Sequence, residues 1–149
     1  MSNQQLTPAA LMAKADTACS SARVLLDLGD VDGAANRAYY AMFDAARAAL
    51  LASGVPVAPD IGRTHSGLIG AFGNYLVKNG PVSKDMGRLL NRAHEIRQVA
   101  DYNGESVEPS DALGMVEQAE TFVAAMRAEF MPEDSKDNDC GMEPSSKKR

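Results

Sequence analysis

Apolar residues recur every three or four positions over most of the chain, in segments separated by glycine and proline. This spacing is typical of amphipathic α-helices, because residues three and four apart lie on the same side of a helix. The pattern predicts five helices, at about residues 7–29, 30–53, 62–79, 83–101 and 109–130. We therefore predict an all-α fold, an up-and-down bundle of four to five antiparallel helices joined by short links.

The predicted helix boundaries coincide with capping residues and helix breakers. Thr7 followed by Pro8 is typical of a helix start, and Asp30 and Ser83 are suitable N-caps for the second and fourth helices. The segment 54–60 contains glycine and two prolines, which predicts an irregular connection. The sequence thus divides into an N-terminal extension at 1–6, a helical domain at 7–130 and a polar tail at 131–149 that we expect to be disordered.

The fourth predicted helix carries two adjacent stripes. The stripe that we expect to face the core contains Leu89, Ala93, Ile96 and Ala100. The stripe beside it contains Leu90, His94, Arg97 and Asp101. An imidazole, a guanidinium and a carboxylate therefore lie along one side of this helix.

Composition supports the helical prediction. The chain has 149 residues, of which 45% are hydrophobic, with four Phe, four Tyr and no Trp, so it can bury a core but has few of the aromatic residues that strands favour. Its two cysteines, Cys19 and Cys140, are too few for a zinc site and fit a reducing cytoplasm. No basic and apolar leader or membrane-length apolar run is present, so we expect neither secretion nor membrane insertion.

The formal net charge of −5 argues against a broad nucleic-acid-binding face, because such faces need many lysines and arginines to neutralise phosphates. A contact with RNA or DNA would have to be local, or shared with another subunit.

Two short runs, 36–43 and 96–102, place arginine and tyrosine in otherwise apolar helical segments. Burying such groups without partners costs free energy, so we expect them to face each other, a partner or a ligand. If the two helices are neighbours, their polar side chains form one patch. Its members are Asn36, Arg37, Tyr40, His94, Arg97, Asp101 and Tyr102.

A structural interpretation of the same residues stays open. Arg97 and Asp101 are four apart and can form a simple helix pair, and tyrosines often lie at the margin of a core with the hydroxyl in water. His65, on the apolar side of the third predicted helix, can be a hydrogen-bonded core residue.

Three strings, NRAYYAMFDAAR at 36–47, RTHSG at 63–67 and IRQVADY at 96–102, resemble the HEPN domain family, named for higher eukaryotes and prokaryotes nucleotide binding. The resemblance runs in the same order over residues 7–130. It implies a helical bundle, often a homodimer, that occurs alone or beside a minimal nucleotidyltransferase in toxin–antitoxin modules. Active members are metal-independent ribonucleases, so neither a metal nor another cofactor is expected.

The resemblance also implies a catalytic pair, in which an arginine is followed after four to six residues by a histidine. The histidine would act in acid–base chemistry and the arginine would hold the phosphate. Arg97 matches the arginine, but Asp101 and Tyr102 follow it and no histidine does. Arg88 and His94 have the required spacing and form a second candidate pair.

Two hypotheses follow. In the first, a HEPN-type, toxin-like protein binds nucleotide or RNA and acts as a ribonuclease, with Arg97 on the phosphate, Asp101 orienting Arg97, and Arg37, Tyr40 and His65 lining the same groove. In the second, the domain is a non-catalytic module that dimerises or docks a nucleotidyltransferase. Under either hypothesis, Tyr102 is a candidate for nucleotidylation by such a partner.

Overall fold

The computed structural model describes residues 6–131, and over this range the chain folds into five α-helices and one π-helix without strands. The all-α prediction is confirmed. The elements, in chain order, are α1 (Pro8–Asp27), α2 (Val31–Ser53), α3 (His65–Ala71), the π-helix η1 (Phe72–Lys78), α4 (Lys84–Asn103) and α5 (Pro109–Phe130).

The predicted caps begin their helices. The Thr7 hydroxyl accepts a hydrogen bond from the Ala10 backbone N–H at 3.1 Å, and the Asp30 carboxylate accepts one from the Gly33 N–H at 2.9 Å. Ser83 caps α4 in the same way. Each cap satisfies one of the N–H groups that a helix start leaves without an intrahelical partner.

The third helix differs from its prediction. It begins at His65 rather than near residue 62, because Gly62 has a φ of +107°, which is incompatible with a right-handed helix. Its second half is the π-helix η1. The predicted apolar side is nonetheless correct, since Leu68, Ile69, Phe72 and Leu76 are all buried.

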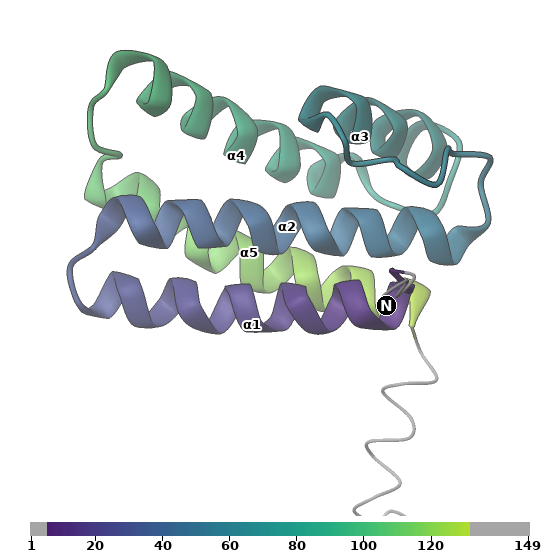
Figure 1. Cartoon of the computed structure of the whole chain (residues 1–149), viewed down its shortest axis with the longest axis horizontal. Helices are drawn as coiled ribbons and strands as arrows, with labels where there is room; N and C mark the ends of the chain where they lie inside the picture. Colours follow the sequence, from purple (N-terminus) through teal and green to yellow (C-terminus); the bar gives the residue numbers. More distant parts are fainter. Residues whose placement is uncertain (1–5, 132–149) are drawn as a thin grey trace, which may run out of the picture.

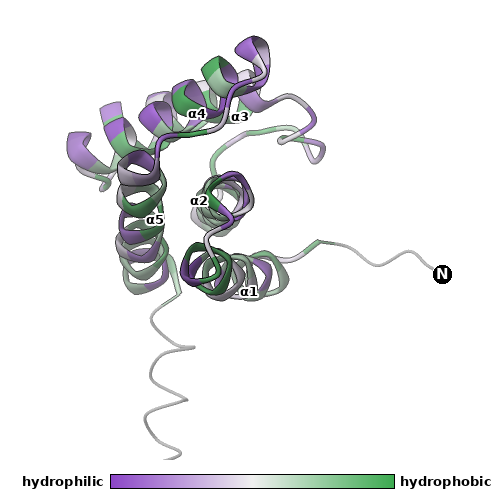
Figure 2. Cartoon of the chain, turned by 90° about the vertical axis from the view of Figure 1, so that its left-hand side faces the viewer, coloured by the Kyte–Doolittle hydropathy of each residue, from purple (hydrophilic) through white to green (hydrophobic). Residues whose placement is uncertain are grey.

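Helix α2 occupies the centre of the bundle (Figures 1 and 2). α1 lies along one side of α2, α3 and α4 lie over the opposite side, and α5 packs beside both α1 and α2. This position explains its composition. The α2 residues at spacings of four and three on one side are alanines with no exposed surface, namely Ala34, Ala38, Ala41, Ala45 and Ala48.

The core-facing stripe predicted for α4 is confirmed in part, because all four of its residues pack in or against the core but only Ala93 is fully buried. Leu90 and Ala93 are buried, whereas Leu89, Ile96 and Ala100 are only partly buried. In the neighbouring stripe, Leu90 is buried, and His94 and Arg97 contact Tyr39 of α2. Asp101, at the end of that stripe, is exposed. α4 therefore uses both stripes, the apolar one against the core and the polar one against aromatic side chains of α2.

Met131 is 8% exposed and packs on the core, so the bundle extends one residue past the predicted boundary at 130. The rest of the predicted tail, like residues 1–5, lies outside the described residues. Within the described part, none of the helices is long and apolar enough to cross a membrane.

Candidate functional site

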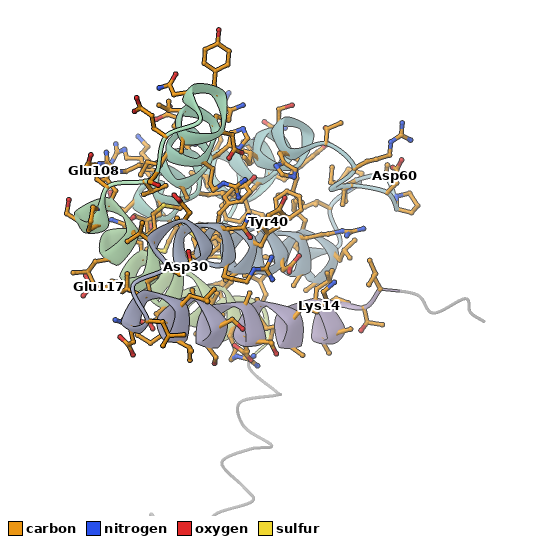
Figure 3. All side chains as sticks on the ribbon, turned by 60° about the vertical axis from the view of Figure 1, so that its left-hand side comes forward. Lys14, Asp30, Tyr40, Asp60, Glu108 and Glu117 are labelled. Atoms are coloured by element: carbon orange, nitrogen blue, oxygen red, sulfur yellow. The ribbon has the colours of Figure 1, made fainter. Side chains whose placement is uncertain are left out.

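Six side chains from three helices meet on the side of α2 that faces α3 and α4. We refer to them as the Tyr–His cluster. They are Tyr39, Tyr40 and Phe43 of α2, His65 of α3, and His94 and Arg97 of α4. Figure 3 labels Tyr40, which lies between the α2 ribbon and the layer formed by α3 and α4.

Tyr39 is the centre of the cluster. Its side chain is 1% exposed, and its hydroxyl lies 3.1 Å from Nδ1 of His65 and 3.3 Å from Nδ1 of His94. Burial raises the pKa of Tyr39 well above its usual value, and the nearby Tyr40 adds to this effect. The phenol therefore keeps its proton at neutral pH. Tyr39 is not among the residues of the polar patch predicted from the sequence.

Arg97 covers the two tyrosines. Its guanidinium carbon lies 5.8 Å from the Tyr39 ring centre and 6.0 Å from that of Tyr40, which is cation–π geometry. Its Nη2 donates to Asp101 Oδ2 at 2.8 Å, so the Arg97–Asp101 helix pair is confirmed. Its Nη1, in contrast, is buried and has no hydrogen-bond partner among the described residues.

Arg37 contacts Tyr40 as well. Its guanidinium carbon lies 5.5 Å from the Tyr40 ring centre, and its Nε donates to Asn36 Oδ1 at 3.3 Å. Two guanidinium groups from separate helices therefore converge on one phenol ring. The expectation that Arg37 and Arg97 lie together is confirmed by this geometry.

His94 is held neutral at physiological pH. Burial lowers its pKa below the ordinary value of 6.5, and electrostatic interactions with His65 and Arg97 act in the same direction, opposed by Glu95. A neutral imidazole can both donate and accept a proton, which an imidazolium cannot.

A pocket of about 350 Å³ opens beside Arg97. Its lining includes Asn36 but also three carboxylates, Asp32, Asp101 and Glu105. The Asp32 carboxylate accepts hydrogen bonds from the Val107 N–H and the Ser106 hydroxyl, which lower its pKa, so it is charged. An anionic ligand is thus disfavoured inside this pocket.

Two predicted site residues lie apart from the cluster. Tyr102, at the end of α4, is 91% exposed. Arg88 is exposed and pairs with Asp85 at 2.9 Å, so the alternative pair of Arg88 and His94 is not assembled. Within residues 6–131, no group of three or more His, Cys, Asp or Glu side chains is arranged to hold a metal ion.

The family model of the HEPN domain matches residues 9–129, the whole helical bundle. The chain belongs to the HEPN domain family. The resemblance noted in the sequence is thereby confirmed.

Three relatives of this HEPN chain span most of its length. A UPF0332 protein of Thermotoga maritima is 37% identical over 70% of this chain and 76% of its own. The UPF0332 protein glr0978 of Gloeobacter violaceus is 35% identical over 76% of this chain and 87% of its own. The Methanocaldococcus jannaschii protein named "Putative toxin MJ0605" is 32% identical over 76% of this chain and 81% of its own.

Proposed function

We propose that this HEPN protein is toxin-like and binds RNA or a nucleotide, with a phosphate group held by Arg97 and Arg37 beside Tyr40. The convergence of two guanidinium groups from different helices on one tyrosine carries the proposal. The name of the M. jannaschii relative supports the toxin-like role.

The unpaired Nη1 of Arg97 supports a ligand at this place. A buried donor without an acceptor costs about 1 to 3 kcal/mol, more when it is charged, and a phosphate oxygen would remove that cost. Asp101 already holds the other nitrogen, so it acts by orienting the guanidinium. Because its carboxylate is already engaged by Arg97, we give it no catalytic role.

The test compares Arg97→Ala with Arg88→Ala in binding to a short single-stranded RNA, followed by fluorescence anisotropy. Loss of charge-assisted hydrogen bonds worth about 1.5 to 3 kcal/mol weakens binding by about 10- to 100-fold in Arg97→Ala. Arg88 lies on the same helix but points into solvent, so Arg88→Ala should keep the affinity within about twofold. Equal affinities of both variants and the wild type would refute the site.

The second candidate function is a non-catalytic module, dimerising or docking a minimal nucleotidyltransferase. The Arg97–Asp101 pair and the acidic pocket wall favour it, since both can be purely structural. Under this function Arg97→Ala lowers the melting temperature and leaves RNA affinity unchanged. A homodimer mass in light scattering fits either function, whereas a shift to a larger complex on adding the nucleotidyltransferase fits the second. In that complex an added nucleotide on Tyr102 would appear in the intact mass.

A further inference from the structure

The Tyr39 hydroxyl has one proton, yet two ring nitrogens lie within hydrogen-bond distance of it, 3.1 Å for His65 and 3.3 Å for His94. It can donate to only one of them. If both imidazoles donated instead, the phenol proton would lack an acceptor in a site that is 1% exposed. The Tyr39 hydroxyl and both Nδ1 atoms all have hydrogen-bond partners when one Nδ1 donates to the hydroxyl and the other accepts from it.

This arrangement makes the two histidines different. The imidazole that donates through Nδ1–H has a bare Nε2, which is a base. The imidazole that accepts at Nδ1 carries its proton on Nε2, which is a donor. One phenol thus sets a base and an acid side by side, with ring centres 6.0 Å apart and both side chains partly exposed.

We propose that His65, Tyr39 and His94 form a proton relay that supplies both the base and the acid for cleavage of an RNA phosphodiester bond. The proposal rests on the proposed function, because Arg97 and Arg37 beside the relay are the groups that would hold the phosphate. It needs no histidine after Arg97, which this chain lacks. In this role Tyr39 is a positioning residue, and the two histidines are the groups that touch the substrate.

The step balances within the relay. The bare Nε2 of the first histidine takes the proton of the ribose 2′-hydroxyl as its oxygen attacks phosphorus. The bond from phosphorus to the 5′-oxygen breaks, and that oxygen takes the proton from Nε2 of the second histidine. The Nδ1 proton of the first histidine moves to Tyr39, and the Tyr39 proton moves to Nδ1 of the second. Both rings end neutral with their roles exchanged, and the products are a 2′,3′-cyclic phosphate and a free 5′-hydroxyl.

The charged groups around the relay fix its dependence on pH. Arg37 on α2 and Arg97 on α4 repel an added proton, and Glu95 on α4 attracts one. An added proton removes the bare Nε2, and with it the base. Cleavage should therefore rise with pH along a single ionisation and then stay level, because Tyr39 keeps its proton in the alkaline range. Two histidines acting independently, one charged and one neutral, would instead give a bell-shaped profile.

The tautomers can be observed without any substrate. The chain has two histidines, so labelling histidine with ¹⁵N leaves two imidazoles in the NMR spectrum. At pH 8 we expect one ring protonated at Nδ1 and the other at Nε2, and we expect Tyr39→Phe to abolish this difference while the backbone spectrum stays folded. Two rings protonated at Nε2 in the wild type would overturn the relay.

Cleavage is tested with variants that keep the hydrogen bond to Tyr39. Asparagine places an amide near the position of Nδ1 but has nothing at Nε2, so His65→Asn and His94→Asn should each lower the cleavage rate by about 10²- to 10⁴-fold while RNA affinity changes little. Arg88→Ala is the control that should cleave like the wild type. An RNA with a 2′-deoxy residue at the cut should bind and stay intact.

The two proposals fail in different ways. If the wild type binds RNA through Arg97 but cleaves none, the relay is refuted and the binding function stands. If cleavage survives in both asparagine variants, the histidines are not the acid and base. If Arg97→Ala binds RNA like the wild type, the proposed function itself is refuted.

Discussion

The two sides of α2 pack against different kinds of surface. On the side towards α1, small alanines with no exposed surface let two helices pack closely over an apolar contact. On the side towards α3 and α4, the same helix presents Tyr39 and Tyr40 to two histidines and an arginine. One helix therefore contributes an apolar core on one side and a polar, titratable cluster on the other.

This difference indicates which side of α2 can contribute to a functional site. The five alanines of this side have no group that can bind a proton or an anion, and their full burial leaves little space for larger side chains. The cluster side contains protonatable nitrogens and an arginine nitrogen without a partner. If this division is correct, steric changes should harm the alanine side most, and changes in pH should act through the cluster side.

The largest effect on stability is expected for Ala41→Leu on the alanine side. Ala41 has no exposed surface, so the added carbon atoms have no space, and overpacking of this kind costs about 1 to 3 kcal/mol or more. We expect the melting temperature to fall by roughly 3 to 12 °C, measured by circular dichroism.

Ala128→Leu on α5 is the matched control, because residue 128 is exposed and leucine is nearly as good a helix former as alanine. Its stability should change by no more than about 0.5 kcal/mol. Equal effects of the two substitutions would mean that the alanine side is loosely packed, and the comparison would fail.

An intermediate effect is expected from His94 on acidification. Because burial and its positive neighbours lower the pKa of His94 in the folded state, the unfolded chain binds a proton first as the pH falls. The stability of the wild type should therefore decline as the pH falls from about 7 through the unfolded value of 6.5 towards the lower, folded value. Urea unfolding at pH 7.5 and 5.5 should show a smaller decline for His94→Asn, and parallel declines would exclude His94 as the sensitive group.

The sequence was sufficient to predict the helices because their signals are local. Thr7, Asp30 and Ser83 cap the helices that they were expected to cap, since an N-cap acts on a backbone N–H three residues away. The late start of α3 was missed because it depends on the backbone conformation of Gly62, which its identity permits but does not require.

The site was only partly predictable for the opposite reason, that its contacts join distant segments. The two runs at 36–43 and 96–102 correctly predicted that Arg37, Tyr40 and Arg97 lie together, because polar side chains in apolar helical segments need partners. Tyr39 was missed since its spacing is that of a core residue, and only the fold shows that its hydroxyl meets two histidines, 26 and 55 residues further along the chain. A fully buried tyrosine requires a partner for its hydroxyl, and that rule, applied to Tyr39, was the available signal.

The smallest effect on stability is expected at Asp44, which lies on α2 at the border between the alanine side and the cluster side. Burial raises the pKa of its carboxyl, although Lys14 of α1 and the nearby Arg47 and Arg37 act in the opposite direction. A raised pKa means that the folded state disfavours the charged form, so ionisation of Asp44 costs stability as the pH rises through the folded pKa.

Asp44→Asn removes the charge at nearly constant shape, and it should stabilise the protein slightly at pH 7, by about 0.5 kcal/mol or less. The gain should vanish at about pH 3, below the unfolded value of 3.8, where the carboxyl of the wild type is largely protonated in both states. Urea unfolding of the two proteins at both pH values measures this difference. If Asp44→Asn is instead less stable at pH 7, the attraction of the Asp44 carboxylate to Lys14 and the two arginines outweighs the cost of its burial. The charged side chains of α2 then contribute to the contact with α1 as well.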